Sequence, residues 1–314
     1  MPKKKTKALL LFSGGLDSIL ALKILEEQNI KVIPLYFESV FFGEFTGVQN
    51  FGNENFRSLQ NLRKIDFSEK QFELVKNPRY GHGKNLNPCV DCHLLMLKEA
   101  KKIMKKEGCD FVATGEVLGE RPMSQNKNAL ELVEKKSSLH GLLLRPLSAK
   151  LLSPTIIEKN GLVERNKLFD ISGRGRNCQL ALAKKYGIID FPSPAGGCLL
   201  TDPAFSKRLK KLLEKKSSPA LSDLELLKLG RHFWQENILI VVGRNEEENK
   251  KIRKIALEND ILTELKNITG PLTLIRGKKI PASAIKKAQE LTAHYSTRAR
   301  GKKDLEFTLL KLTD

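Results

Sequence analysis

Two groups of residues in this sequence have types and spacings suited to chemistry. The run Ser13-Gly14-Gly15-Leu16-Asp17-Ser18 combines two glycines, two hydroxyls and one carboxylate. Cys89 and Cys92 form a CxxC pair, and Cys198 follows two glycines. Glycine-rich turns let the backbone approach an anion closely, and grouped thiols can bind metal or carry sulfur. The sequence therefore indicates an anion site and a thiol site.

The glycine-rich run lies between an apolar stretch and a helical pattern. Residues 8–12 (ALLLF) predict a buried strand, and residues 17–28 carry apolar side chains at helical spacing. Free N–H groups at a helix start bind phosphate, and Asp17 beside phosphates suits a Mg²⁺ or nucleotide contact. The run is not a Walker A loop. The plainer alternative is an ordinary glycine-rich turn.

Three interpretations of the cysteines remain open. The first is a structural zinc site, with His93 as the added ligand, although neighbouring residues rarely share one zinc ion. The second is a redox or persulfide pair formed by Cys92 and Cys198. The third is an iron–sulfur cluster held by Cys89, Cys92 and Cys198, which leaves one iron open to hold sulfide. The missing fourth cysteine favours the cluster, since closed sites have four protein ligands.

The remaining cysteines, Cys109 and Cys178, lie in apolar or helical contexts and are expected to be small core residues. Further strands are expected at residues 31–37, 62–67, 111–114 and 142–147, with a helix over 94–107. Such alternation predicts a Rossmann-like α/β fold, with a parallel sheet and helices on both faces. Ligands are then expected beyond the carboxyl ends of the strands.

The charge balance points to a polyanionic partner. The 314 residues include 55 Lys and Arg against 36 Asp and Glu, a net charge of +19. Nucleic acid is the default partner for such an excess, and a lysine-rich surface of a heat-adapted protein is the alternative. No apolar run approaches the roughly 20 residues that span a bilayer. The apolar run near the N-terminus is too short for a signal peptide. We therefore expect a soluble, cytoplasmic protein without a membrane partner.

The chain is expected to contain two domains, residues 1–204 and residues 205–314. The second part holds 24 Lys and Arg against 14 Asp and Glu. Its pattern predicts a helix over 206–216, strands at 238–242 and 272–275, and a helix over 283–292. We expect a smaller, basic α+β domain.

SGGLDS after a strand resembles the signature of the PP-loop ATP pyrophosphatases, which activate a carbonyl oxygen as an adenylate. The segments VATGE (112–116), GERPMSQ (119–125), RPL (145–147), SGRGRN (172–177) and SPAGGC (193–198) are similar to the tRNA thiouridine synthetases of that group. The resemblance implies a fold of the adenine nucleotide α-hydrolase-like (HUP) type, with ATP and Mg²⁺ as ligands. It assigns nucleotide contacts to Ser13, Gly14, Gly15, Asp17, Ser18, Tyr36, Phe37, Gly115, Ser124 and Gln125.

The CxxC pair with a distant cysteine resembles cluster-dependent tRNA thiolation enzymes of the same group. The resemblance implies ATP-dependent thiolation of a tRNA uridine, with sulfur supplied as sulfide or by a persulfide carrier. Adenylation of the uridine carbonyl would precede attack by sulfur held on a 4Fe–4S cluster. Asp17, Cys92 and Cys198 are the expected catalytic residues.

The C-terminal part resembles the RNA-binding domain of NFACT proteins, through VGRN (242–245) and the YSxAR-type segment YSTRAR (295–300). It departs from that family at LTELKNITGPLTL, where a PGSH segment is usual. Side chains expected to contact RNA phosphates are Lys278, Lys279, Arg298, Arg300, Lys302 and Lys303. Phe233 and Trp234 have apolar neighbours and are expected in the core.

Two other functions remain open at this point. A PP-loop ligase or amidotransferase acting on a small substrate would explain SGGLDS, but neither the three cysteines nor the charge. A non-catalytic RNA-binding protein would explain the C-terminal part, but not an intact phosphate loop.

Overall fold

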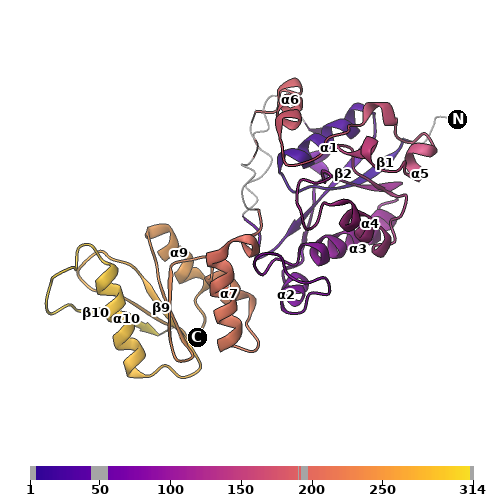
Figure 1. Ribbon diagram of the computed structural model, residues 1–314. Coiled ribbons are helices and arrows are strands. Elements are labelled where there is room, and N and C mark those ends of the chain that lie inside the picture. Colours follow the sequence, from indigo (N-terminus) through magenta and orange to yellow (C-terminus); the bar gives the residue numbers. More distant parts are fainter. Residues whose placement is uncertain (1–4, 44–55, 190, 192–196, 312–314) are drawn as a thin grey trace. The chain divides into compact units, whose positions relative to one another are not determined.

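The computed structural model describes residues 5–43, 56–189, 191 and 197–311. The chain divides into two units, Met1–Thr201 and Asp202–Asp314 (Figure 1). Among the described helices, none is long and apolar enough to cross a membrane.

A parallel five-stranded sheet forms the centre of the first unit, in the order β3-β2-β1-β4-β5. Its middle strand is almost wholly apolar, as expected for a parallel strand buried on both faces. Leu9 of this strand pairs with Ile33 on one side and with Val112 on the other. The strands are β1 (Lys7–Leu11), β2 (Lys31–Glu38), β3 (Arg63–Asp66), β4 (Phe111–Thr114) and β5 (Leu143–Leu144).

Helices cover both faces of this sheet, which confirms the predicted fold class (Figure 1). Alternate strand residues enter two core layers, because successive side chains point to opposite faces. Leu10 packs in the layer of α1 and α6, whereas Leu9 packs in the layer of α3 and α4. The helices are α1 (Leu16–Glu27), α2 (Ser68–Lys76), α3 (Cys89–Lys106), α4 (Lys127–Lys136), α5 (Ile156–Lys159) and α6 (Asn177–Lys185).

The strand order places a topological switch point between β1 and β4. Chain connections leave these two neighbouring strands in opposite directions, and ligands of α/β proteins bind in the crevice that results. SGGLDS follows β1 and the ATGE segment follows β4, so both expected nucleotide segments meet at this point.

Three sequence predictions need correction in this unit. The helix expected after CxxC begins at Cys89 itself, because Pro88 is its N-cap. The strand expected over 142–147 is only two residues long, since Arg145 turns into a buried ion network. Cys109 is buried as expected, but Cys178 is exposed because α6 turns Gln179 and Ala183 inward instead. Residues 193–196 of the SPAGGC segment lie outside the described residues.

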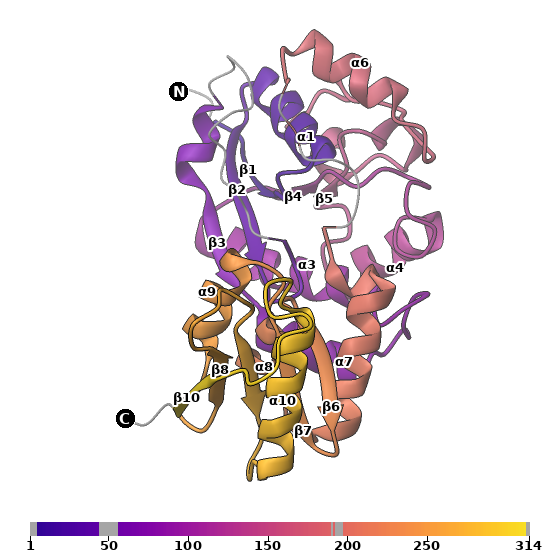
Figure 2. The ribbon, with the colours of Figure 1, turned by 90° about the vertical axis from the view of Figure 1, so that its left-hand side faces the viewer.

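An antiparallel sheet forms the second unit, in the order β10-β8-β9-β7-β6. Figure 2 shows α10 along one face of this sheet, and α8 and α9 contribute to the opposite core layer. This α+β arrangement confirms the predicted fold class of the C-terminal part. Its elements are α7 (Pro203–Lys215), α8 (Leu221–Leu226), β6 (Arg231–Gln235), β7 (Ile238–Val242), α9 (Glu246–Ile255), β8 (Ile261–Leu265), β9 (Thr273–Arg276), α10 (Ala282–Tyr295) and β10 (Phe307–Lys311).

His232 of β6 makes the second unit sensitive to acid. Burial, with Arg208 and Arg244 nearby, lowers the pKa of His232 to about 4. Its Nε2 hydrogen-bonds to the Leu229 carbonyl at 2.7 Å, whereas Nδ1 is buried without a partner among the described residues. In the unfolded chain this histidine binds a proton near pH 6.5. The contribution of neutral His232 to the free energy of unfolding is therefore complete above that pH and is lost as the pH falls toward 4.

We expect His232→Gln to remove this contribution, which is about 3 kcal/mol at most. Glutamine keeps an N–H that can reach the Leu229 carbonyl and does not titrate. Urea unfolding of wild type and variant at several pH values between 6.5 and 4 measures the effect. Carboxylates titrate in both proteins, so their contributions cancel in the comparison. Identical pH slopes for wild type and variant would contradict this role of His232.

Candidate nucleotide and sulfur site

The phosphate-binding candidate is a tight turn between β1 and α1. Gly14 adopts a φ of +77°, a conformation that residues with a Cβ rarely reach. Ser18 Oγ donates to the Gly15 carbonyl at 2.8 Å, and the Gly15 N–H donates to Ser13 Oγ at 3.3 Å. These bonds, with the Ser18 N–H donating to the Gly15 carbonyl at 3.0 Å, fix the turn at the N-terminal end of α1, and helix ends of this kind bind anions.

Gly115 of the ATGE segment packs directly against this turn. A Cβ built on Gly115 would lie 2.7 Å from the backbone carbon of Asp17 and 2.7 Å from the backbone nitrogen of Ser18. A nucleotide contact was expected for this glycine; in the structure its neighbour is the loop backbone. Glycine is required here because any side chain would displace the loop.

We expect Gly115→Ala to weaken ATP binding by at least about tenfold, because the loop backbone must move to admit the methyl group. Gly43→Ala is the matched control, since nothing lies within 4 Å of that position. Calorimetric titration with ATP, with circular dichroism as a check on folding, measures the effect. Equal ATP affinity in wild type and Gly115→Ala would show that this contact does not set the loop.

Buried polar atoms without partners surround Asp17. Among the described residues, no hydrogen bond reaches Asp17 Oδ1, Arg176 Nε or either amide atom of Gln179. Gln179 is fully buried. Burial raises the pKa of Asp17, and the charge of the Arg176 guanidinium opposes that rise. Buried polar groups normally have partners, so this cluster is built to receive a polar ligand.

Phosphate oxygens and Mg²⁺ fit this cluster. The guanidinium and the amide can donate to phosphate, and the carboxylate can bind the cation. Arg176 and Gln179 were not predicted as site residues. The signal available was SGRGRN, which ends at the first residue of α6 and carries Arg176 toward the phosphate loop.

The segment from Gly119 to Gln125 forms a closed loop near Asp17. Gly119 N–H donates to the Gln125 carbonyl at 2.7 Å, and Arg121 N–H donates to Gln125 Oε1 at 3.2 Å. Gln125 thus braces the loop that carries Glu120 and Arg121, and Ser124 is buried within it. Burial raises the pKa of Glu120, and the charge of Asp17 adds to that rise.

Arg121 connects the nucleotide site to the thiols. Burial raises the pKa of both Asp17 and Cys198, and the positive charge of Arg121 is one of several effects that oppose these rises. One exposed guanidinium therefore acts electrostatically on both candidate sites. Sequence reasoning did not single out this arginine.

The two aromatic residues at the end of β2 have different surroundings. Tyr36 and Phe37 are both buried, and their side chains point to opposite faces of the sheet. Phe37 packs in the α3 layer, with its ring centroid 5.2 Å from that of Phe67. Tyr36 faces the α1 side, where the phosphate loop lies, so it is the better placed of the two for a nucleotide.

The three candidate thiols come from two segments of the first unit. Cys89 and Cys92 occupy the first turn of α3, and their spacing of three residues puts both on one helix face. Cys198 forms an isolated antiparallel bridge with Phe42, beyond the end of β2. Cys89 interacts electrostatically with both Cys92 and Cys198, and Cys198 also acts on Cys92. The fold thus groups all three predicted cysteines.

Each sulfur in this group faces amide donors. Asn87 Nδ2 donates to Cys89 Sγ at 3.1 Å, and Gln71 Nε2 donates to Cys92 Sγ at 3.5 Å. The backbone N–H groups of residues 200 and 201 hydrogen-bond to the Cys198 sulfur. Amide donors of this kind accompany thiolates that bind metal.

Within the described residues, the three thiols do not form a ready-made site for a single metal ion. In the ranges that the structure describes, no three His, Cys, Asp or Glu side chains are grouped tightly enough to hold one metal ion. Zinc binds thiolates at about 2.3 Å and therefore needs them tightly grouped, whereas a cluster places several irons between its cysteines. Burial raises the pKa of Cys92 to about 12 and that of Cys198 to about 11. Such thiols are poor nucleophiles unless a metal takes the proton.

A buried ion network supports the first turn of α3. His93 Nδ1 lies 2.8 Å from Glu116 Oε1, and Arg145 Nε donates to Glu116 Oε2 at 3.0 Å. These charges lower the pKa of the Glu116 carboxyl to about 2, against the effect of its burial. Glu116 belongs to the ATGE segment and Arg145 to the RPL segment, so the network explains how these two segments position α3. It leaves His93 engaged away from the thiols, which speaks against His93 as a zinc ligand.

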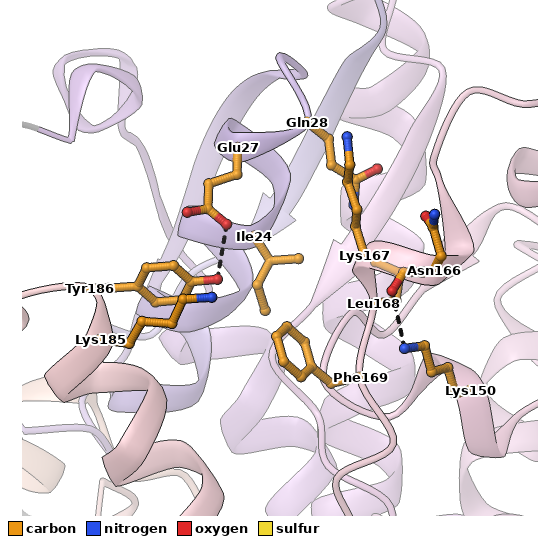
Figure 3. Close-up of a pocket in the computed structure, with 10 residues that line it drawn as sticks. All are labelled: Ile24, Glu27, Gln28, Lys150, Asn166, Lys167, Leu168, Phe169, Lys185 and Tyr186. Atoms are coloured by element: carbon orange, nitrogen blue, oxygen red, sulfur yellow. Dashed lines mark hydrogen bonds between the residues drawn. The ribbon is translucent and has the colours of Figure 1, made fainter.

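A surface pocket of about 240 Å³ lies away from these residues (Figure 3). Glu27 and Gln28 line it at the end of α1, whereas the phosphate loop precedes that helix. A helix of 12 residues is about 18 Å long, so the two places are at opposite ends of α1. Tyr186 donates to Glu27 at 2.9 Å within the pocket.

The basic residues predicted to contact RNA form two groups in the second unit. Lys278 and Lys279 precede α10, and the other four follow it. The helix has 14 residues and is about 21 Å long. Arg298 donates only to the neutral Thr269 hydroxyl, at 3.1 Å. Phe233 and Trp234, expected in the core, are only half-buried.

Comparison with known proteins now decides the family. Residues 4–172 match the model described as thiamine biosynthesis protein (ThiI), which is more than half of the chain. The chain belongs to the ThiI family. Residues 230–312 match the model of the NFACT protein RNA binding domain. Both resemblances predicted from the motifs are confirmed.

Curated relatives match part of the chain. A probable tRNA sulfurtransferase of Methanosarcina mazei is 32% identical over 124 residues, which cover 36% of this chain and 29% of that protein. A probable tRNA sulfurtransferase of Thermococcus kodakarensis is 29% identical, covering 45% and 36%. The tRNA-specific 2-thiouridylase MnmA of Petrotoga mobilis is 29% identical, covering 36% and 35%. The chain thus spans about a third of the length of these relatives.

Solved structures also align with this chain. A 4-thiouridine synthetase–RNA complex with bound ATP aligns at TM-score 0.34 and 20% identity, covering 70% of this chain and 52% of that one. The U34-tRNA thiolase NcsA from Methanococcus maripaludis with its 4Fe–4S cluster aligns at TM-score 0.33 and 17% identity, covering 72% and 74%. These TM-scores are too low to assign a site in this chain.

Proposed function

We propose that this protein thiolates a uridine of tRNA in an ATP-dependent reaction. The observation that carries the proposal is that one unit holds both a phosphate loop with unpartnered buried polar atoms around Asp17 and the Cys89, Cys92 and Cys198 thiols with their amide neighbours. A nucleotide site and a sulfur site in one unit can act on one substrate. Membership of the ThiI family and tRNA sulfurtransferase relatives support this reading.

The phosphate loop would hold ATP for attack by the uridine carbonyl oxygen. N–H groups at the start of α1 would meet the phosphates, and Asp17 would hold a Mg²⁺ ion that neutralises part of the phosphate charge. Arg176 donates to the phosphates that become pyrophosphate and stabilises the charge that builds on them. The carbonyl oxygen bonds to the α-phosphorus as the bond to pyrophosphate breaks. Tyr36 lies beside the nucleoside.

The three thiols would hold the sulfur source. Cys89, Cys92 and Cys198 fit a 4Fe–4S cluster through their number, their shared location and their amide donors, and such a cluster supplies a bound sulfide as nucleophile. Asn87 and Gln71 orient two of the sulfurs. Attack of sulfide at the activated carbon breaks the C–O bond and releases AMP, so that one ATP yields thiouridine, AMP and pyrophosphate.

The basic C-terminal unit would bind the tRNA. Its match to an RNA-binding domain model and its excess of Lys and Arg support this role. A small-substrate ligase would use the phosphate loop but leaves the thiol group and the C-terminal unit unexplained. A purely RNA-binding role leaves the unpartnered cluster around Asp17 unexplained.

Nucleoside mass spectrometry tests the proposal. Protein purified without oxygen is incubated with unmodified tRNA, ATP, Mg²⁺ and sulfide, and the tRNA is then digested. We expect thiouridine, with AMP formed in equal amount, and neither product when tRNA is omitted. ATP turnover that does not depend on tRNA would favour the small-substrate ligase. No turnover under any of these conditions would favour the purely RNA-binding role.

A further inference from the structure

The exposed end of α10 carries an aromatic and arginine cluster, formed by Arg231, Phe233, His294 and Tyr295. The guanidinium of Arg231 lies 4.5 Å from the ring centroid of Tyr295. The His294 ring meets Tyr295 edge-on at 4.8 Å, and the Phe233 ring lies 5.9 Å away. A planar cation stacked on an aromatic ring is a common surface for a further flat ring.

The position of this cluster leaves it accessible. Arg231 and Phe233 belong to β6, which is an edge strand of the sheet (Figure 2). His294 is exposed, and the other three side chains are half-buried. Phe233 and Tyr295 anchor the cluster by packing against the apolar core of α10. The anchored side holds the rings in place, and the other side faces outward.

The charge around this cluster is not neutralised. Within the described part of the chain, Arg231 forms no ion pair, whereas Arg244 pairs with Glu248 at 3.1 Å and Arg276 pairs with Asp260 at 2.7 Å. Arg298 and Arg300 follow Tyr295 in successive turns, held by the buried Ala299. One guanidinium without an ion pair in the described residues therefore lies on the Tyr295 ring, and two further arginines follow that tyrosine within five residues of the chain.

We propose that this cluster is a stacking site for an unpaired RNA base, with the neighbouring arginines on the adjoining phosphates. Aromatic and guanidinium planes are what unpaired bases stack on, and paired bases inside a duplex cannot reach them. The proposal rests on the proposed function, in which tRNA is the partner. It adds that the C-terminal unit binds a single-stranded part of that RNA. The aromatic and arginine cluster would contact the base, and Arg298 and Arg300 would contact phosphates.

Four variants of the full chain separate stacking from charge. Tyr295→Leu removes the ring and keeps an apolar side chain, and Tyr295→Phe keeps the ring. Arg231→Lys keeps the charge and loses the plane. The double variant Arg298→Glu/Arg300→Glu removes phosphate contacts. The probes are tRNA, a single-stranded RNA oligonucleotide carrying 2-aminopurine, and a duplex RNA of the same sequence.

We expect Tyr295→Leu and Arg231→Lys to weaken single-stranded binding about tenfold. Both should lose most of the 2-aminopurine quenching and leave duplex binding and the salt slope unchanged. Tyr295→Phe should behave as wild type. The double variant should instead lower the salt slope for every RNA. Arg231 is at the surface, so its variant remains informative if Tyr295→Leu fails to fold.

Equal losses for duplex and single-stranded RNA would overturn the stacking site, and so would wild-type quenching in Arg231→Lys. Absence of quenching with the wild-type protein would overturn it as well. These outcomes are distinct from failure of the proposed function. If the wild-type chain thiolates tRNA but fails the stacking tests, only the stacking site is wrong. If it shows no affinity for tRNA, the proposed partner is wrong.

Discussion

Replacing Asp17 with asparagine is expected to lower tRNA-dependent AMP formation by at least about 100-fold. The amide keeps the size of the side chain but loses the charge that binds Mg²⁺ beside the phosphates. Asp17 Oδ1 is buried without a partner among the described residues, and burial raises the pKa of this carboxyl. The charge of Asp17 therefore does not stabilise the ligand-free protein, and the melting temperature of Asp17→Asn should equal or exceed that of wild type.

The measurement is release of labelled AMP and pyrophosphate at saturating ATP, with calorimetric melting of both proteins. Glu131→Gln on the exposed side of α4 is the matched control, because it removes one carboxylate charge away from the loop. AMP formation within threefold of wild type in Asp17→Asn would remove Asp17 from the mechanism. A falling melting temperature would instead indicate a structural role.

Replacing Cys198 with alanine is expected to abolish thiouridine formation while ATP binding and pyrophosphate release persist. The surroundings of Cys198 are the backbone of residues 200 and 201 and the charge of Arg121, and among the described residues they do not include the phosphate loop. Losing one of three thiols should break the sulfur site without moving Asp17.

The control is Cys178→Ala, since Cys178 is exposed on α6 and lies outside the thiol group. Thiouridine is measured by nucleoside mass spectrometry, and pyrophosphate release is followed in the same reactions. Full thiouridine yield from Cys198→Ala would rule out a sulfur role for this residue. Loss of both activities would mean that the two sites are not separable.

Local patterns were sufficient to predict much of this structure. The strands at 111–114 and 238–242 were predicted to the residue, because apolar runs bounded by turn residues are strong signals. Strand–helix alternation predicted that ligands bind beyond the carboxyl ends of the strands, whereas the meeting of SGGLDS and ATGE depends on the strand order, which alternation does not give. The grouping of Cys198 with the CxxC pair was anticipated from the chemistry of three thiols.

Other site residues depend on contacts that no local pattern encodes. Gln179 reaches Asp17 because α6 folds back over α1 from more than 150 residues away, and its inward face was not evident from the sequence. The same helix turns Cys178 outward, against expectation. Arg121 is in an exposed loop whose closure by Gln125 brings it near both sites.

The amounts of iron, zinc and acid-labile sulfide per chain test whether Cys89, Cys92 and Cys198 act together as one sulfur site. The protein is purified without oxygen, with Cys198→Ala and Cys178→Ala alongside. We expect about four irons and four sulfides per chain in wild type and in Cys178→Ala, and we expect both to be lost in Cys198→Ala. Zinc, or no metal at all, in wild-type protein would contradict this expectation.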